Sequence, residues 1–407
     1  MSQHKIIRLG HQGDGIAQGP VFAPLTLPGE VVSGTLDGQA LRDVKIDTPS
    51  PDRVAPPCRH FKSCGGCQLM HASDDFLADW KQEVVASALG AHGITAEFAP
   101  IHVSPAQSRR RATLTARRTK KGAMAGFHAK GSDVIIEIPD CKLLHPAVLG
   151  AVPVACALAQ TGATRKNGIS VSVTLSLNGL DVSVSEGKPL DGPLRIVLAA
   201  LAEHHNLARL AWDNEVVVTR HAPEQVFGTA RVLPPPGAFL QATAEGEAAL
   251  LADVQAIVGG AKRIIDLFAG SGTFALPLSR NAEVHAVEGS AAMCAALDAG
   301  WRKTQGLKSV TTEARDLFRQ PILPDELKRF DAVVIDPPRA GAEAQIAELC
   351  RTRVPVIAYV SCSPTSFARD AKVLLAGGYH LDRLRVVDQF RWSSHVEMVA
   401  GFTLNPA

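Results

Sequence analysis

The chain has 407 residues, of which 46% are hydrophobic and 20% are charged, and its formal net charge is only +2. This length implies two or three domains with sizeable cores, and so small a net charge does not by itself indicate a nucleic-acid binder. No apolar run reaches the roughly 18 residues that a membrane helix needs, and the N-terminal residues lack the apolar segment of a signal peptide. We therefore expect a globular, cytoplasmic protein without a membrane partner.

Residues 1–50 have the pattern of a small β-barrel. Short apolar stretches between residues 6 and 47 are separated by glycines, as tight connections between short strands require. The segments Gly13-Asp14-Gly15-Ile16 and Leu27-Pro28-Gly29-Glu30-Val31-Val32 resemble a TRAM domain. In RNA-modifying enzymes this OB-like barrel helps to hold RNA.

The next segment, residues 51–236, begins after a proline-rich break and carries cysteines spaced like metal ligands. In a chain without a secretion signal, such cysteines are expected to be ligands, catalytic groups or core residues rather than disulfides. Four thiolates suit either a tetrahedral zinc ion or a [4Fe-4S] cluster, and the spacing does not separate the two. The four candidates are Cys58, Cys64, Cys67 and Cys141, whereas Cys156, Cys294 and Cys350 lie in apolar helical contexts and are expected in cores.

Two further features of this segment are a helix and a basic stretch. Residues 73–90 have helical apolar spacing, Ser73 suits the helix N-terminus, and this helix is a candidate to pack on the C-terminal domain. Between Ile101 and Lys130 there is no acidic residue, which favours a phosphate-backbone partner, with a solvated charged face as the alternative. Residues 111–117 alternate like a strand, which would align their charges on one face. The predicted RNA-binding residues are Arg109, Arg110, Arg111, Arg117, Arg118, Lys120 and Lys121.

Residues 237–407 alternate between helix and strand, which predicts a parallel, doubly wound α/β sheet. The expected helix covers residues 244–258, and the expected strands cover 263–267, 283–287, 332–335 and 356–360. Glycines in Asp266-Leu267-Phe268-Ala269-Gly270-Ser271-Gly272-Thr273-Phe274 would let a ligand approach the backbone at the carboxyl end of the first strand. Glu288 ends the second strand, where it could bind ribose hydroxyls, and Asp316 ends a possible third strand, where it could face adenine. With the downstream Asp336-Pro337-Pro338, this loop resembles a class I S-adenosylmethionine-dependent methyltransferase.

Cys362 lies where an apolar strand runs out at Ser361-Cys362-Ser363-Pro364. Such a place suits a nucleophile, because the strand fixes the thiol and the turn exposes its sulfur. A buried small hydrophobe is the alternative, and for an isolated cysteine it is the commoner outcome.

The order of the motifs makes the resemblance narrower. Phe239-Leu240-Gln241, the glycine loop, Val287-Glu288-Gly289, Asp336-Pro337-Pro338-Arg339, Tyr359-Val360-Ser361-Cys362 and His395-Val396-Glu397 together resemble the RNA uracil-C5 methyltransferase family. The resemblance implies that Cys362 is the nucleophile at uracil C6 and Glu397 the base that removes the C5 proton. It departs from the family at Ser363 and Thr243, where relatives carry asparagine. The cofactor-binding residues that it implies are Gln241, Phe268, Gly270, Gly272, Thr273, Glu288, Asp316 and Asp336.

The cysteines resemble the iron-sulfur branch of the same family, which favours a [4Fe-4S] cluster over zinc and a role in bracing the RNA-binding domain. The expected fold is thus a Rossmann-like methyltransferase domain with an N-terminal OB-like barrel and a central α+β iron-sulfur domain. The barrel and the cysteines together resemble enzymes that act on 23S ribosomal RNA. A transfer RNA substrate and a non-catalytic iron-sulfur RNA-binding module are the alternatives. Nothing in the sequence requires a protein partner, so a monomer is expected.

Overall fold

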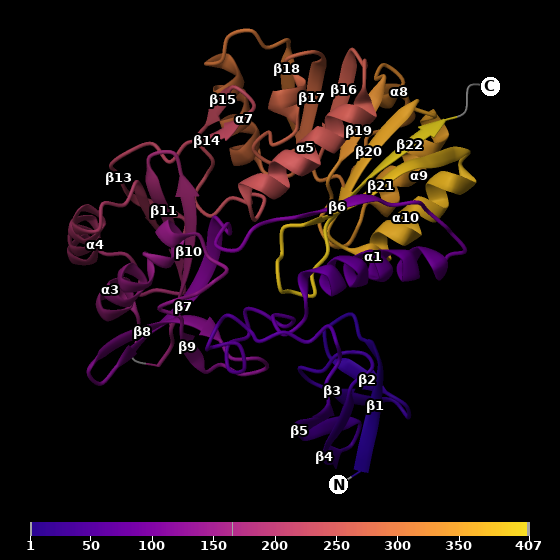
Figure 1. Cartoon of the computed structure of the whole chain (residues 1–407). Helices are drawn as coiled ribbons and strands as arrows, with labels where there is room; N and C mark the ends of the chain where they lie inside the picture. The colour runs from indigo at the N-terminus through magenta and orange to yellow at the C-terminus, as the bar shows by residue number, and fades with distance from the viewer. Residues whose placement is uncertain (1, 165, 405–407) are drawn as a thin grey trace.

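A computed structural model describes residues 2–164 and 166–404 of the chain. Within these ranges the strands form a closed barrel, a central sheet, a short hairpin and a C-terminal sheet. Figure 1 shows the barrel at the bottom, the central sheet at the left and the C-terminal sheet at the upper right. Among the described residues, no helix is both long enough and apolar enough to cross a membrane.

The N-terminal barrel forms as its glycine-punctuated sequence predicts. Ile6, Val32 and Leu41 fill its interior, and the strands close in the order β1-β2-β3-β5-β4. Closure leaves no free sheet edge in so small a module. The strands are β1 (Ser2–Leu9), β2 (Gly15–Ala17), β3 (Val21–Ala23), β4 (Val31–Asp37) and β5 (Ala40–Thr48).

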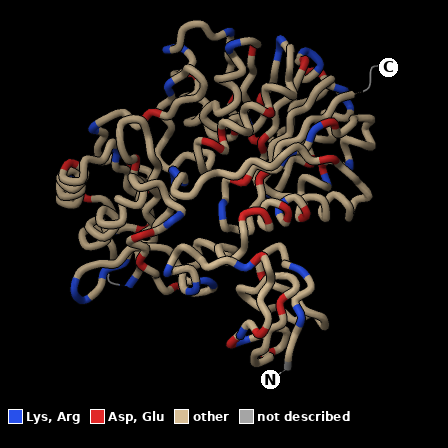
Figure 2. Tube along the Cα trace, viewed as in Figure 1, with Lys and Arg blue, Asp and Glu red and all other residues tan. Residues whose placement is uncertain are grey.

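The central sheet has helices on one face and leaves its other face open. Along β7, Ala112, Leu114 and Ala116 are buried beneath helix α3, whereas Arg111 and Arg117 lie on the open face. The predicted alternation at residues 111–117 is therefore confirmed. Figure 2 shows basic residues gathered at the end of the β7–β8 hairpin, at its lower left. The sheet contains β7 (Arg111–Thr119), β8 (Gly122–His128), β9 (Ile135–Glu137), β10 (Ile169–Ser176), β11 (Gly179–Ser185), β12 (Arg209–Trp212) and β13 (Glu215–Thr219), with helices α2 (Pro146–Leu149), α3 (Val152–Gly162) and α4 (Gly192–His204).

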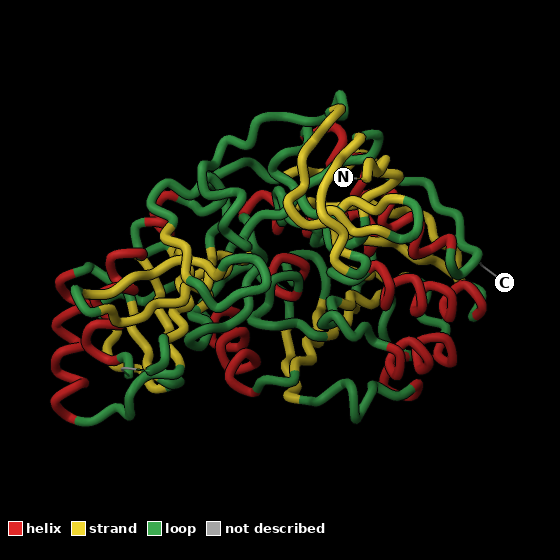
Figure 3. The backbone as a smooth tube through the Cα atoms, turned by 90° about the horizontal axis from the view of Figure 1, so that it is seen from below, coloured by secondary structure: helices red, strands yellow, loops and turns green. Residues whose placement is uncertain are grey.

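The C-terminal sheet has the predicted doubly wound form, with strand order β18-β17-β16-β19-β20-β22-β21-β6. Its central strands β19 and β20 are buried on both faces, as their continuous apolar runs require. Figure 3, seen from below, shows this domain and the central sheet side by side, as Figure 1 does. Its strands are β6 (Ala99–Val103), β16 (Arg263–Leu267), β17 (Glu283–Glu288), β18 (Val310–Ala314), β19 (Ala332–Ile335), β20 (Val356–Ser361), β21 (Tyr379–Asp388) and β22 (Met398–Leu404). The remaining elements are the hairpin β14 (Gln225–Phe227) and β15 (Ala230–Val232) and the helices α5 (Ala244–Val258), α6 (Ala275–Leu278), α7 (Ala291–Arg302), α8 (Pro324–Leu327), α9 (Glu343–Thr352) and α10 (Pro364–Ala376).

A segment from the middle of the chain completes the C-terminal domain. Helix α1 (Asp74–Gly90) begins at Ser73, whose hydroxyl accepts the N–H of Phe76, and its Val85 and Leu89 join the core of the C-terminal sheet. Strand β6 pairs in parallel with β21 at the edge of that sheet. Helix α1 thus packs on the C-terminal domain as expected, while its Leu77 and Trp80 join the core of the central domain. The packing differs from a division at residue 237 chiefly in strand β6. Strand β6 was not expected from its short, proline-containing sequence.

Candidate active site

The side chains expected to carry chemistry meet at one edge of the C-terminal sheet. Glu288 ends β17, Asp336 follows β19 and Cys362 follows β20, and these strands run parallel to β16 between them. Parallel strands bring their carboxyl ends to the same edge, where open α/β sheets bind ligands. The topology thus gathers residues that are distant in sequence.

The glycine loop after β16 is shaped for close approach by a ligand. Gly270 has φ of +57°, and no heavy atom lies within 4 Å of the position that a Cβ would take there. Gly272 has φ of +100°, and a Cβ would lie 2.8 Å from the side chain of Leu276. Both positions therefore require glycine, the first for its backbone angle and the second for packing as well. Thr273 is half-buried at the end of the loop.

The carboxylate of Glu288 is fixed by the same loop. The N–H of Gly270 donates to Glu288 Oε2 at 3.0 Å, and the N–H of Ser290 donates to Oε1 at 2.9 Å. A carboxylate offers about four lone-pair sites, so both oxygens can still accept a hydroxyl proton. This geometry supports the ribose-binding role expected for Glu288.

Two aromatic rings flank the approach to the loop. Phe268 has φ of +61°, a left-handed conformation that costs a non-glycine residue energy and is concentrated at functional sites. Its ring centroid lies 5.5 Å from that of Phe318, which is 49% exposed. Asp316 lies beyond the end of β18, where its carboxylate accepts the N–H of Phe318.

A buried carboxylate that the sequence interpretation did not single out lies beneath the loop. Asp266 is completely buried, and its side-chain oxygens make no hydrogen bond of good geometry, although the backbone N–H of Ala275 lies near enough to lower its pKa. Burial, together with the neighbouring charge of Asp336, raises its pKa well above the usual value. A buried carboxyl group with so little hydrogen bonding is a candidate to bind a cation or a donor. The signal in the sequence was a charged residue in an otherwise apolar strand.

Buried polar side chains form a connected chain across the edge of the sheet. The amide Nε2 of Gln241 donates to Asp336 Oδ2 at 3.3 Å, and Gln241 Oε1 accepts from Gln389 Nε2 at 2.6 Å. Gln389 Nε2 also donates to Glu397 Oε2 at 3.1 Å. The structure therefore brings three predicted residues together through Gln389, which no sequence motif indicated.

The thiol of Cys362 lies among acidic groups. Burial, and then the nearby carboxylates of Glu397 and Asp336, raise its pKa to about 11, while Arg339 acts in the opposite direction. Burial alone raises the pKa of Asp336 to about 7. Burial and Asp336 also raise the pKa of Glu397 well above its usual range. The site therefore favours binding of a positive charge, which would stabilise all three ionised groups.

Comparison with known proteins agrees with this geometry. The tRNA (Uracil-5-)-methyltransferase family matches residues 235–405. An uncharacterized RNA methyltransferase of Rhizobium meliloti is 45% identical over 97% of this chain and 97% of its own length. A 23S rRNA (uracil(1939)-C(5))-methyltransferase, RlmD, of Chromohalobacter salexigens is 33% identical over 98% of this chain and 88% of its own length. The chain belongs to the RNA uracil-C5 methyltransferase family.

This methyltransferase also shares its whole fold with a solved structure. The tRNA (uracil-54, C5)-methyltransferase of Pyrococcus abyssi, in complex with S-adenosyl-L-homocysteine, aligns with a TM-score of 0.78 over 98% of this chain and 99% of its own. The two sequences are 22% identical, so the likeness concerns the fold. Membership of the family makes the chain an RNA uracil-C5 methyltransferase and removes the alternative of a non-catalytic binding module.

The two departures from the family pattern both occur at the N-terminus of a helix in this methyltransferase. Thr243 caps helix α5, because its hydroxyl accepts the N–H of Gly246 at 3.0 Å. Ser363 caps helix α10 by accepting the N–H of Ser366 at 3.4 Å. Threonine and serine are favourable at helix N-termini. Both positions are therefore occupied by residues that begin a helix.

Three of the predicted basic residues of the methyltransferase are partly buried, and the other four are exposed. Arg110 forms an ion pair with Glu247 and donates to the backbone carbonyl of Gln241, so it connects the two domains rather than presenting a free charge. Arg109 and Arg111 are half-buried, over the rings of Phe390 and Phe239 at 5.9 and 4.6 Å. The remaining four are exposed on the β7–β8 hairpin: Arg117, Arg118, Lys120 and Lys121.

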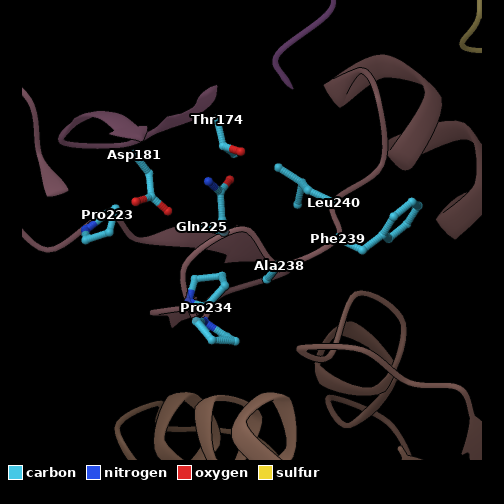
Figure 4. Close-up of a pocket in the computed structure, with 9 residues that line it drawn as sticks. Thr174, Asp181, Pro223, Gln225, Pro234, Ala238, Phe239 and Leu240 are labelled. Carbon is cyan, nitrogen blue, oxygen red and sulfur yellow. The ribbon is translucent and has the colours of Figure 1, made fainter. Parts of the chain in front are cut away.

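A small pocket lies between the central sheet and the segment that leads to Gln241. Figure 4 shows Phe239 and Leu240 at one side of it and Asp181 and Gln225 at the other. Both carboxylate oxygens of Asp181 accept hydrogen bonds from the buried guanidinium of Arg209: Oδ1 from Nε at 2.8 Å and Oδ2 from Nη2 at 2.7 Å. Its charge is therefore already compensated, and the pocket has the character of a domain junction.

The four candidate ligand cysteines line one recess. Apolar side chains such as Phe61, Met70 and Phe127 form the rest of its wall. Burial and the charges of the other cysteines raise the pKa of Cys67, while Arg109 opposes this increase. Among the residues that the structure describes, no group of three or more His, Cys, Asp and Glu side chains is arranged to hold a metal ion. The convergence of the cysteines is thus observed, whereas a metal site is not.

Proposed function

We propose that this methyltransferase uses S-adenosylmethionine to methylate C5 of a uridine in 23S ribosomal RNA. The observation that carries the proposal is the meeting of Cys362, Glu397 and Asp336 at the sheet edge that also holds the glycine loop. A thiol and a carboxylate side by side are the nucleophile and the base that substitution at C5 of uracil requires. The relative from Chromohalobacter salexigens, which is named as a 23S rRNA enzyme, supports the choice of RNA.

The residues of the loop fit S-adenosylmethionine. The open space at Gly270, the fixed carboxylate of Glu288 and the buried carboxyl of Asp266 suit a ligand with ribose hydroxyls and a cationic amine. Phe268 and Phe318 offer rings near the place where the adenine would lie. When bound, S-adenosylmethionine would supply a methyl group to C5, and its sulfur would keep the electron pair of the broken S–C bond.

Cys362 makes C5 reactive. Its thiolate donates an electron pair to C6 of uracil, and the electrons of the C5–C6 double bond move toward the C4 carbonyl, so that C5 becomes an enolate carbon. The thiol first loses its proton to solvent water, and Arg339 and a bound sulfonium charge both favour the thiolate.

Glu397 completes the reaction after C5 has gained its methyl group. The carboxylate takes the C5 proton, the C–H electron pair restores the C5–C6 double bond, and the C6–S bond breaks with its electrons returning to sulfur. The raised pKa of Glu397 makes it a stronger base than an exposed glutamate. Burial of the site also requires that the uridine leaves its stack before it reacts.

Mapping of 5-methyluridine in ribosomal and transfer RNA tests the proposed substrate. We expect deletion of the gene to remove this modification from one position of 23S ribosomal RNA, and the wild-type gene to restore it. Purified protein should transfer the labelled methyl group of S-adenosylmethionine to that RNA in vitro. Loss of the modification from transfer RNA alone would contradict the proposal and support the alternative that the family description suggests.

We also propose that the cysteine recess holds a [4Fe-4S] cluster. A cluster takes one thiolate on each of four irons, and the four cysteines that line this recess could supply them. The apolar wall and the positive charge of Arg109 suit a group that carries negative charge. When bound, the cluster would cross-link Cys58, Cys64 and Cys67 to Cys141.

Iron and sulfide analysis of anaerobically purified protein tests the cluster. We expect about four iron and four sulfide per chain, the content of one cluster. Cys67→Ser should lower both and reduce the midpoint temperature of unfolding, whereas Cys156→Ser, a change in helix α3, should leave the iron content unaltered. Protein that contains zinc without iron or sulfide would refute the proposal.

A further inference from the structure

Gln389 occupies the centre of the buried polar chain. It lies immediately after β21, is 1% exposed, and makes three hydrogen bonds through its side-chain amide. The N–H of Ala242 donates to Gln389 Oε1 at 2.7 Å. Because this oxygen faces a backbone donor, the amide nitrogen must lie on the opposite side.

The amide nitrogen of Gln389 donates two hydrogen bonds, and both go to side chains of the proposed reaction site. One bond goes to Gln241 Oε1 at 2.6 Å and the other to Glu397 Oε2 at 3.1 Å. The acceptor role of Gln241 Oε1 leaves its own Nε2 facing Asp336. The direction of hydrogen bonding through the whole chain is thus set by one backbone N–H.

We propose that Gln389 is a positioning residue for proton removal: it holds one oxygen of Glu397, so that the other faces the C5 proton of the methylated uracil. This proposal rests on the function proposed above. In the step concerned, Glu397 Oε1 takes the proton from C5, the C–H pair forms the C5–C6 double bond, and the C6–S bond breaks to return its electron pair to Cys362. A carboxylate free to rotate would reach the proton less often.

The backbone around Gln389 is held in place on both sides. Lys81 Nζ lies 2.6 Å from Asp388 Oδ1 and also donates to the carbonyl of Phe390 at 3.1 Å. Lys81 is completely buried, and Asp388 is nearly so. A glutamine between two such anchored residues has little freedom, as a positioning group requires.

The hydrogen bond from Gln389 to Glu397 also changes the pKa of the glutamate. The bond from Gln389 favours the ionised form of Glu397 and lowers its pKa, against burial and the charge of Asp336, which raise it. Removal of the bond should therefore leave Glu397 protonated up to a higher pH. The base would then be available in a smaller fraction of molecules at neutral pH.

Gln389→Met tests the proposal, because methionine retains the length of the side chain and loses the donor. We expect turnover to fall by about tenfold or more, as part of the roughly 10²–10⁴-fold contribution of a general base, and the pH for half-maximal turnover to rise. RNA with deuterium at C5 of the target uridine should react more slowly than unlabelled RNA with the variant, because proton removal then limits the rate. The isotope effect is a ratio on active molecules, so partial misfolding does not obscure it.

Two further variants make the outcome unambiguous. Glu397→Gln should accumulate the covalent, methylated RNA adduct in a denaturing gel, and failure to do so would refute the proposed function itself. Gln255→Met, at an exposed position of α5, should behave like the wild type. If Glu397→Gln forms the adduct but Gln389→Met shows neither an isotope effect nor a shifted pH profile, the positioning role of Gln389 is wrong.

Discussion

Replacing Cys362 with alanine should reduce methyl transfer to RNA by at least about 10³-fold, because loss of a covalent nucleophile removes the intermediate that divides the reaction into accessible steps. The acidic neighbours of this thiol, Glu397 and Asp336, cannot replace it, because a carboxylate oxygen is a weaker nucleophile toward C6 than a thiolate. The measurement is single-turnover transfer of a labelled methyl group from S-adenosylmethionine to RNA. Binding of S-adenosylhomocysteine, followed by calorimetry, should change little.

Cys350→Ala is the matched control, since Cys350 is another free thiol of the same domain, in helix α9. It should retain methyl transfer. Activity of Cys362→Ala near the wild-type level would overturn the covalent mechanism while leaving the family assignment intact.

The pH dependence of Cys362 alkylation provides an independent check. Because its pKa in the free protein is about 11, the thiol is mostly protonated at neutral pH, and its rate of reaction with iodoacetamide should increase about tenfold per pH unit below that value. Mass spectrometry of the peptide that contains Cys362 separates it from the other cysteines. A rate that levels off near pH 8 would show that the pKa of this thiol is not raised.

Lys81→Met should lower the free energy of unfolding by about 3–5 kcal/mol, since removal of one partner leaves the other buried charge uncompensated. The pair joins helix α1 to the last residue of β21 at 2.6 Å, with 0% and 4% of the two side chains exposed. Urea denaturation followed by circular dichroism measures the loss. The loop that carries Gln389 should also become more susceptible to protease.

Two variants test whether the burial of the charge causes this loss. Lys328→Met removes a pair with Asp325 whose side chains are 68% and 92% exposed, and it should lower the stability far less than Lys81→Met, because water screens exposed charges. Lys81→Met combined with Asp388→Asn should recover part of the stability, because no buried charge remains. A double variant as unstable as Lys81→Met alone would contradict the explanation.

Local patterns were sufficient to predict most elements of the C-terminal domain. Strands β16 and β19 and helix α5 have the predicted bounds, and Ser73 begins α1 as expected. These features depend on apolar periodicity, helix capping and the chemistry of glycine, which act between residues near one another in sequence. Contacts made at long range left no such signal, as strand β6 and the ion pair of Arg110 demonstrate.

The sequence by itself determined the order of the motifs, the doubly wound sheet and the two residues expected to perform the chemistry, Cys362 and Glu397. It did so because strand ends, glycine turns and residue types are local properties of the chain. Only the tertiary structure decided which polar groups share the buried site, since Gln389, Asp266 and Lys81 derive their roles from partners far away in sequence and from the loss of water around them. Burial and long-range pairing are properties of the folded chain, and they determine the charge and the orientation of the groups proposed to act in catalysis.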